Sequence, residues 1–117
     1  EPVDRRLLLE LRMVAPDRWA LDTFLRDGPE QFLALYDPTR THPAGRWHWV
    51  ALRYHDGVMS HFVDGVCEAE GRVAFRAMGD GQTAIGVRVN RVSWFRGAIR
   101  EVRFHRAALA PEALQRP

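Results

Sequence analysis

The sequence contains no lysine, one cysteine and two serines, and each of these shortages excludes a class of chemistry. All 17 basic residues are arginine, which excludes a Walker A phosphate loop, a Schiff-base lysine and a Ser-x-x-Lys catalytic site. Neither Ser60 nor Ser93 lies in a Gly-x-Ser-x-Gly motif. Cys67, being alone, can form neither an internal disulfide nor a thiolate zinc site.

Long apolar runs are also missing. No stretch approaches the roughly 20 residues that span a bilayer, and no signal-peptide pattern opens the chain. The 117 residues, 46% hydrophobic and 27% charged, predict a single globular domain over residues 1–117. Because the chain starts at Glu1, we expect it to be excised from a longer one. The net charge of +2 and the scattered arginines predict no nucleic-acid partner and no membrane insertion.

An alternation of apolar and polar residues dominates the first half of the chain. From Leu7 to Met13 the odd positions are apolar and most even positions are charged, which indicates a half-buried strand. Further strands are predicted over residues 19–26 and 31–36, with glycine and proline marking the turns between them. Short strands at this spacing favour an antiparallel sandwich or barrel.

The clearest element is a hairpin over residues 46–66. Asp56-Gly57, the favoured dipeptide of a two-residue type I′ turn, lies at its tip and places Tyr54 opposite Met59. Trp49 and Phe62 then lie on the face directed away from the main core. The main apolar face consists of Val50, Leu52, Tyr54, Met59, His61 and Val63.

Two more strands are predicted in the last third of the chain. Residues 83–89 alternate in the same way as the earlier strands. In residues 95–104 the alternation slips after Ile99, and a β-bulge at Arg100-Glu101 restores both halves to one face.

Four segments between residues 46 and 114 carry the motifs of one family in the family's order. They contain Trp-His-Trp-Val-Ala (47–51), Phe-Val-Asp-Gly (62–65), Phe-x-Gly-x-Ile-x-Glu-Val-Arg-Phe (95–104) and Ala-Leu-Ala-Pro-Glu-Ala-Leu (108–114). This set resembles the laminin G-like domains of the concanavalin A-like lectin/glucanase superfamily. The corresponding family motifs are a Trp-His-His-Val-Ala strand, a Tyr-Val-Asp-Gly turn, a closing strand and an Ala-Leu-Ser-x-x-Glu-Ile tail.

The resemblance implies an all-β fold, an antiparallel jelly-roll β-sandwich with its function in the loops and on the concave face. It also assigns Trp47 to the core. The family's opening strand, which usually precedes a segment such as Leu7 to Met13, is absent or trimmed here. Its loss predicts an exposed sheet edge and a homodimer through that edge. His61 stands where the family usually has leucine, and Trp49 where it commonly has a second histidine.

No enzymatic activity is predicted. Glucanases of this superfamily use a Glu-x-Asp-x-x-Glu strand that sets two carboxylates at the retaining separation, and this chain lacks that motif. The nearest pair, Glu68 and Glu70, is interpreted as solvated turn carboxylates, because nothing nearby in the sequence desolvates either of them.

The histidines raise the question of a metal site. In the hairpin register His48 and His61 lie four residues apart, so these two cannot share one ion. His61 is interpreted as a core histidine, with a ligand contact or a pH-sensitive role as the alternative. The remaining candidate ligands are His42 and His55.

No cofactor is predicted, and calcium enters only through the family resemblance. The calcium candidates each adjoin glycine or proline, where an aspartate caps a turn, and we prefer the turn interpretation. Cys67 is interpreted as a small buried residue rather than a reactive thiol. The calcium candidates are Asp37, Asp56, Asp64 and Asp80.

The predicted function is that of a non-catalytic carbohydrate- or glycoprotein-binding module of an exported bacterial protein, extracellular, periplasmic or at the cell surface. The alternative is a structural or protein-interaction domain without a small-molecule ligand. The arginine-only composition is typical of a GC-rich coding sequence, and the expected localisation rests on the resemblance.

The predicted ligand surface is the turn from Arg88 to Trp94. Arginine and asparagine side chains donate to sugar hydroxyls or carboxylates, and an indole stacks on a sugar ring, so an anionic glycan is favoured. The alternative is a plain hairpin turn in which Asn90 takes a positive φ and Arg88 pairs with Asp22 or Glu101. Trp19, Trp49 and Trp94 each fit either sugar stacking or packing. The candidate ligand-binding residues are Arg88, Asn90, Arg91, Trp94, Trp49 and His61.

Overall fold

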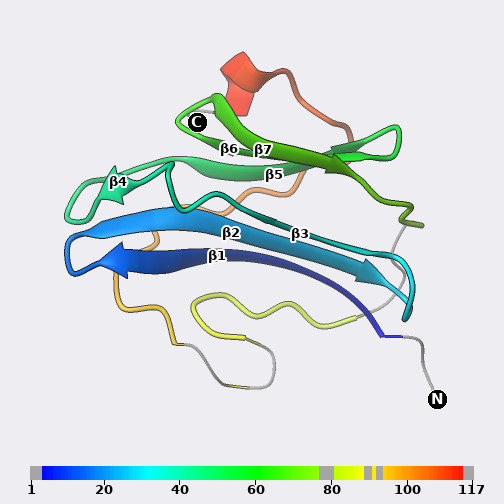
Figure 1. The fold of residues 1–117 in the computed structure, drawn as a ribbon, viewed down its shortest axis with the longest axis horizontal. Coiled ribbons are helices and arrows are strands. Elements are labelled where there is room, and N and C mark those ends of the chain that lie inside the picture. The colour runs from blue at the N-terminus through cyan, green and yellow to red at the C-terminus, as the bar shows by residue number, and fades with distance from the viewer. Residues whose placement is uncertain (1–3, 77–80, 89–90, 92–93, 115–117) are drawn as a thin grey trace. The chain divides into compact units, whose positions relative to one another are not determined.

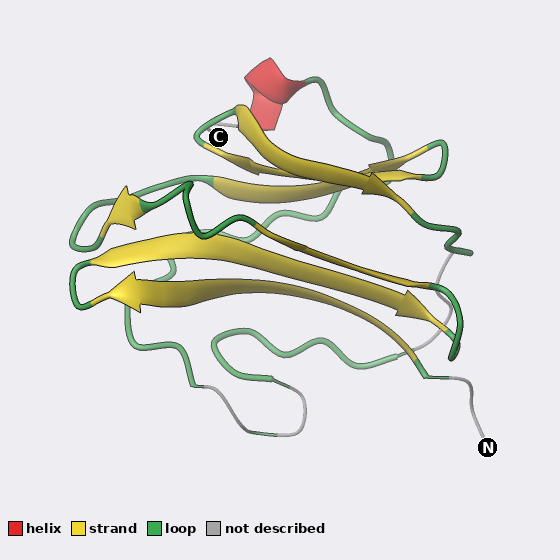
Figure 2. Cartoon of the chain, in the orientation of Figure 1, coloured by secondary structure: helices red, strands yellow, loops and turns green. Residues whose placement is uncertain are grey.

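The computed structural model describes residues 4–76, 81–88, 91 and 94–114, and the chain divides into two compact units. The first unit comprises residues 1–76 and 107–117, and the second comprises residues 77–106. The prediction of one domain over the whole chain is not tested by this division and stays a prediction. All strands of the described residues belong to the first unit (Figures 1 and 2): β1 (Arg5–Ala15), β2 (Arg18–Asp27), β3 (Phe32–Tyr36), β4 (His42–Pro43), β5 (Val50–His55), β6 (Val58–Val63) and β7 (Val66–Arg72), with a 3₁₀ helix, η1 (Pro111–Leu114).

The first sheet has the strand order β1-β2-β3, and β4 also pairs with β2. The antiparallel register of β1 and β2 places Leu11 opposite Leu21 and Met13 opposite Trp19. Because side chains alternate across a strand, the odd-numbered residues of β1 lie on the same face as the buried odd-numbered residues of β2. The strands predicted over residues 7–13, 19–26 and 31–36 are therefore present.

The second sheet has the strand order β5-β6-β7 and contains the predicted hairpin. Tyr54 pairs with Met59, as the Asp56-Gly57 turn requires. Asp56 has a φ of 50° and Gly57 a φ of 77°, the two positive values that a type I′ turn needs. The predicted hairpin register is confirmed.

A β-bulge in β7 places Glu68 outside the regular ladder. Phe62 pairs with Cys67, but the preceding residue, His61, pairs with Ala69, so Glu68 is the extra residue. A bulge of this kind redirects a side chain that would otherwise follow the strand's alternation.

The two sheets pack against each other through two buried clusters. One contains Leu25, Leu35, Met59 and Val73, and the other contains Trp19, Leu21 and Val63. Apolar contacts between antiparallel sheets confirm the predicted all-β sandwich.

Trp47 is not a core residue, and the expectation taken from the family motif is wrong. Its side chain is 66% exposed, whereas Trp19 is 5% exposed. Trp47 precedes β5, so no strand pairing directs its side chain toward the interior. Trp19 lies on β2 opposite Met13 and fills the end of the core.

The face of the second sheet that points away from the core is covered by the C-terminal segment. Arg53 lies 4.9 Å over the ring of Phe62 and donates a hydrogen bond of 3.0 Å to the carbonyl of Leu109. Phe62 is consequently fully buried, although it lies on the outer face as predicted. Figure 1 shows η1 above this sheet.

The second unit contains no strand among its described residues. The strands predicted over residues 83–89 and 95–104, with the bulge at Arg100-Glu101, are therefore not observed. A strand needs a neighbouring backbone to complete its hydrogen bonds, and alternation alone does not supply one. One backbone hydrogen bond, 2.7 Å from Phe95 N to the Gly86 carbonyl, closes the segment between them.

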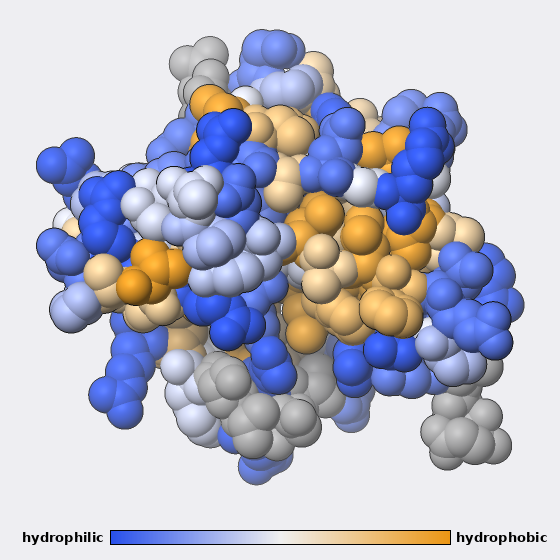
Figure 3. All heavy atoms as spheres, viewed as in Figure 1, coloured by the Kyte–Doolittle hydropathy of each residue, from blue (hydrophilic) through white to orange (hydrophobic). Residues whose placement is uncertain are grey.

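Apolar side chains reach the surface on the side of the molecule drawn in Figure 3, where they gather among hydrophilic ones. In the first unit the exposed apolar residues include Leu7, Leu9 and Met13 of β1. None of the helices in the described part of the chain is long and apolar enough to cross a membrane.

Candidate ligand-binding residues

The predicted ligand turn, Arg88 to Trp94, lies in the second unit. Arg91 N donates to the Arg88 carbonyl at 2.7 Å, and Arg91 has a φ of 66°. Trp94 is 67% exposed. Asn90 lies outside the described residues, so its expected positive φ stays a prediction. The role of Arg88, Arg91 and Trp94 in binding stays a prediction.

The two acidic residues named as alternative partners for Arg88 each bind another arginine. Asp22 Oδ2 accepts hydrogen bonds of 2.9 and 2.7 Å from Nε and Nη2 of Arg12. Glu101 accepts one from Arg103 Nε.

Trp49 and His61 belong to the first unit, whereas Arg91 and Trp94 belong to the second. His61 is 1% exposed and is hydrogen-bonded through Nδ1 to Thr23 Oγ1 at 2.9 Å. Its burial lowers the pKa of the imidazole, which is therefore neutral in the folded core. A ligand cannot reach this side chain, so the geometry corrects its inclusion among the ligand-binding residues and matches the core interpretation. Trp49 is half-buried.

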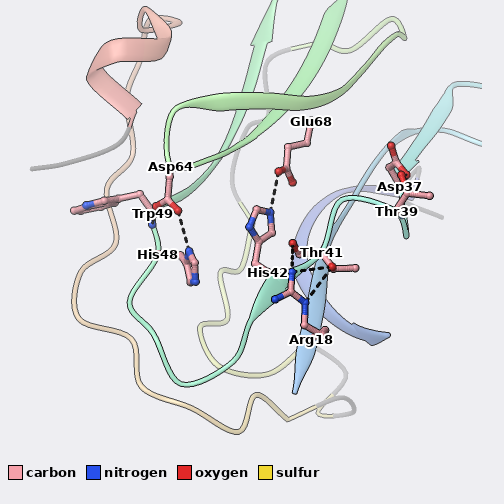
Figure 4. A network of polar contacts seen from close by, with 9 residues as sticks. All are labelled: Arg18, Asp37, Thr39, Thr41, His42, His48, Trp49, Asp64 and Glu68. Carbon is pink, nitrogen blue, oxygen red and sulfur yellow. Dashed lines mark hydrogen bonds and ion pairs between the residues drawn. The ribbon is translucent and has the colours of Figure 1, made fainter. Parts of the chain in front are cut away.

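A cluster of two histidines and two carboxylates lies at one end of the core of the first unit (Figure 4). His42 Nε2 and Glu68 Oε2 are 2.8 Å apart, as are His48 Nδ1 and Asp64 Oδ2. The two imidazole rings lie 5.6 Å from each other and 4.8 and 5.1 Å from the ring of Trp19. The cluster thus connects β2, β4, the segment leading into β5, the β6–β7 turn and β7.

Local backbone structure positions both carboxylates. Asp64 opens the β6–β7 turn with a φ of 50° and also accepts a hydrogen bond of 3.0 Å from Trp49 N. Burial acts to raise the pKa of Asp64, but the hydrogen bonds from His48 and Trp49 outweigh it and lower that pKa. Glu68 is directed to His42 from the bulge of β7.

The interpretation of Glu68 as a solvated carboxylate is wrong. Its side chain is 5% exposed, and Oε1 is buried without a hydrogen-bond partner. Glu70, by contrast, accepts a hydrogen bond of 2.8 Å from Ser60 Oγ. The bulge therefore separates two glutamates that a regular strand would place on one face.

The polar contacts of this cluster join the first sheet to the second, since His42 lies on β4 and Glu68 on β7. An ionised carboxylate only accepts hydrogen bonds, so His48 donates through Nδ1 to Asp64, and its Nε2 is buried without a hydrogen-bond partner. No three His, Cys, Asp or Glu side chains among the described residues are grouped so as to hold a metal ion. The hairpin register relates His48 to His61, but it does not relate either residue to His42. The sequence therefore offered no signal that His42 and His48 lie together.

Three of the calcium candidates have the structure expected of turn residues, and Asp64 at the β6–β7 turn is one of them. Asp37 Oδ1 accepts hydrogen bonds from the backbone N and the hydroxyl of Thr39, at 3.0 and 2.6 Å. Asp56 forms the hairpin tip. Asp80 lies outside the described residues.

The interpretation of Cys67 as a buried residue is wrong. The thiol is exposed, because β7 is the last strand of its sheet and Cys67 follows the turn into it. The burial that remains raises the pKa of the thiol.

Comparison with known proteins establishes the class of this chain. A family model of laminin G type, described as the concanavalin A-like lectin/glucanases superfamily, matches residues 10–115. The chain belongs to this superfamily, which confirms the resemblance seen in its motifs and agrees with its two antiparallel sheets. Its membership supports a lectin-like or protein-interaction module. Searches of curated proteins and of solved structures found no match.

Proposed function

We propose that this chain is a non-catalytic module that binds carbohydrates or glycoproteins, and that it works outside the cytosol as part of an exported bacterial protein. The membership of a lectin-like superfamily supports the class of ligand. The absence of the Glu-x-Asp-x-x-Glu motif supports binding without hydrolysis.

The observation that carries this proposal is the turn that holds Arg91 and Trp94. Arg91 has a φ of 66°, a left-handed conformation that costs a residue with a side chain about 1–2 kcal/mol. Such strain persists only where the surrounding structure holds it in place, and strained residues cluster at ligand sites. Trp94, three residues further on, is 67% exposed and offers an apolar ring face to solvent.

The chemistry of this turn favours an anionic glycan. A guanidinium donates two parallel hydrogen bonds to a carboxylate or sulfate, and an indole stacks on the C–H bonds of a sugar ring. Arg88, whose carbonyl accepts the turn hydrogen bond from Arg91, contributes a second guanidinium to the same segment.

The test is binding to a glycan array at physiological salt, comparing the wild type with the double variant Arg91→Ala/Trp94→Ala. We expect the variant to lose glycan binding at an unchanged melting temperature. Trp47→Ala is the matched control, because it removes an equally exposed tryptophan from the other unit. Binding that survives in the double variant, or a wild type that binds no glycan, would contradict the proposal.

The alternative function is a protein-interaction domain without a small ligand. The exposed apolar residues of β1 favour it, since an uncovered sheet edge pairs readily with another chain. A wild type that binds no glycan but forms a stable complex with another protein domain would support this alternative.

A further inference from the structure

Two hairpin turns of the second sheet are built alike, and each has an aspartate followed by a glycine at its tip. Asp56-Gly57 joins β5 to β6, and Asp64-Gly65 joins β6 to β7. The φ values are 50° and 77° in the first turn and 50° and 81° in the second, the positive pairs that a type I′ turn needs. A chemical difference between the two aspartates therefore comes from the contacts of their side chains.

The two carboxylates differ in how firmly they are held. Asp64 Oδ1 accepts a hydrogen bond of 3.0 Å from Trp49 N, and Oδ2 accepts one of 2.8 Å from His48 Nδ1 (Figure 4). Among the described residues, the carboxylate of Asp56 meets only the neighbouring His55, whose Nε2 lies 3.2 Å from Oδ2. The side chains of this pair are 86% and 69% exposed, and an exposed ion pair fixes a side chain only weakly. Only the Asp56 side chain can therefore rotate readily toward the backbone that follows it.

The backbone nitrogen that follows Asp56 is also accessible to its carboxyl group. The carbonyl of Gly57 accepts a hydrogen bond of 3.0 Å from Val73 N, but the N–H of Gly57 donates to no atom of the described residues. Because glycine has no Cβ, a neighbouring carboxyl carbon can approach this nitrogen closely.

A third Asp-Gly pair within the described residues is blocked at both atoms. Gly28 N donates a hydrogen bond of 2.9 Å to the Asp4 carbonyl. The carboxylate of Asp27 accepts hydrogen bonds of 2.8 Å from Arg5 and 2.9 Å from Arg76. Of the three pairs, only Asp56-Gly57 thus combines a weakly held carboxyl group with an unpartnered nitrogen.

We propose that Asp56 is a site of spontaneous modification, at which aspartate isomerises to isoaspartate. Gly57 N attacks Cγ of the protonated side-chain carboxyl group, a C–N bond forms, and the amide proton leaves with the carboxyl hydroxyl as water. Water then adds to the former main-chain carbonyl carbon of this cyclic succinimide, and the bond from that carbon to Gly57 N breaks. One water is released and one is consumed, so the mass of the chain does not change.

Isomerisation alters the hairpin from its tip. The product links Asp56 to Gly57 through the side-chain carboxyl group, which adds one methylene carbon to the main chain and leaves the former main-chain carboxyl group as a free anion. The turn then no longer has the length that sets Tyr54 opposite Met59. The modified chain should therefore unfold at a lower urea concentration. This inference does not depend on the proposed glycan binding, since the reaction needs no ligand.

The test is a prolonged incubation of the whole folded chain at pH 7. Peptide mapping by mass spectrometry with electron-transfer fragmentation distinguishes isoaspartate from aspartate at each position. We expect isoaspartate to form about tenfold faster at Asp56 than at Asp64, because the second carboxyl group must first lose a charge-assisted hydrogen bond. His48→Ala removes one hydrogen bond from Asp64 and should narrow this difference, with circular dichroism to confirm that the variant is folded.

The unfolded chain is the matched control, because in urea both Asp-Gly pairs lose their contacts and should react at similar rates. Asp56→Glu should form no isomer at this position, since its longer side chain would have to close a larger ring. A folded chain without isoaspartate at Asp56, or with equal rates at Asp56 and Asp64, would overturn the proposal. A difference that persists in urea would trace it to the sequence and would overturn the structural cause.

Discussion

Thr23 Oγ1 and His61 Nδ1 lie 2.9 Å apart between the two sheets, and both residues are almost completely buried. This hydrogen bond joins β2 of the first sheet to β6 of the second. It explains how a histidine is accommodated at a position where the family usually has leucine, because the threonine hydroxyl satisfies the ring nitrogen.

We predict that His61→Leu lowers the free energy of unfolding by about 1–3 kcal/mol, because the buried Thr23 hydroxyl loses its partner. The double variant Thr23→Val/His61→Leu should recover most of this loss, since both polar groups are then replaced by apolar ones. Urea unfolding at pH 7 measures both effects. A double variant less stable than the single variant would contradict the pairing.

The same histidine should make stability depend on pH. Burial lowers the pKa of His61, so below about pH 6.5 the unfolded chain binds a proton that the folded chain does not. The contribution of this group to stability is therefore complete above that pH and declines as the pH falls toward the folded-state pKa. Urea midpoints between pH 7 and pH 5 should fall less in Thr23→Val/His61→Leu than in the wild type.

Trp19 fills the core whereas Trp47 is exposed, and substitution should reveal this difference. Trp19→Ala is expected to cost about 3–5 kcal/mol, because it empties one end of the core. Trp47→Ala should change stability by no more than about 0.5 kcal/mol, as expected for an exposed side chain. Chemical denaturation of the two variants side by side tests the assignment, and equal losses would refute it.

Asp27 should be a main source of acid sensitivity. Hydrogen bonds from the side chain and backbone of Arg76, with a further one from Arg5, lower the pKa of Asp27 well below its usual range. Its contribution is present above about pH 4, where the unfolded carboxyl ionises, and is lost as the pH falls through the folded-state pKa. Asp27→Asn should be less stable than the wild type at pH 7.

The difference in stability between the wild type and Asp27→Asn should become smaller as the pH is lowered. Unfolding midpoints at pH 7 and at pH 2–3 provide the comparison, and a gap that stays constant would show that the carboxylate charge contributes nothing.

A side chain at Gly57, at the hairpin tip, should destabilise the fold. Its φ of 77° lies in the left-handed region, so Gly57→Ala is expected to cost about 1–2 kcal/mol. Gly81→Ala is the matched control, because no atom lies within 4 Å of an added Cβ there and its φ is not in the left-handed region. The melting temperatures of both variants test this prediction, and an equal fall in the two would argue against the turn.

Local patterns in the sequence determined the elements whose partners are near in the chain. The Asp56-Gly57 dipeptide sets the register of its hairpin because a two-residue turn leaves no choice of pairing. The alternation from Leu7 to Met13 similarly defines one strand and its two faces. The family motifs added the superfamily and the two-sheet sandwich.

Tertiary structure decided everything that depends on residues meeting across the sheets. The sequence did not relate His42 to His48, because no register connects a residue before the hairpin to one inside it. It did not foresee the bulge that directs Glu68 into the interior, nor that Trp19 rather than Trp47 fills the core. The alternation in residues 83–89 and 95–104 likewise predicted strands that the described structure lacks, because a strand requires a paired neighbour as well as a suitable sequence.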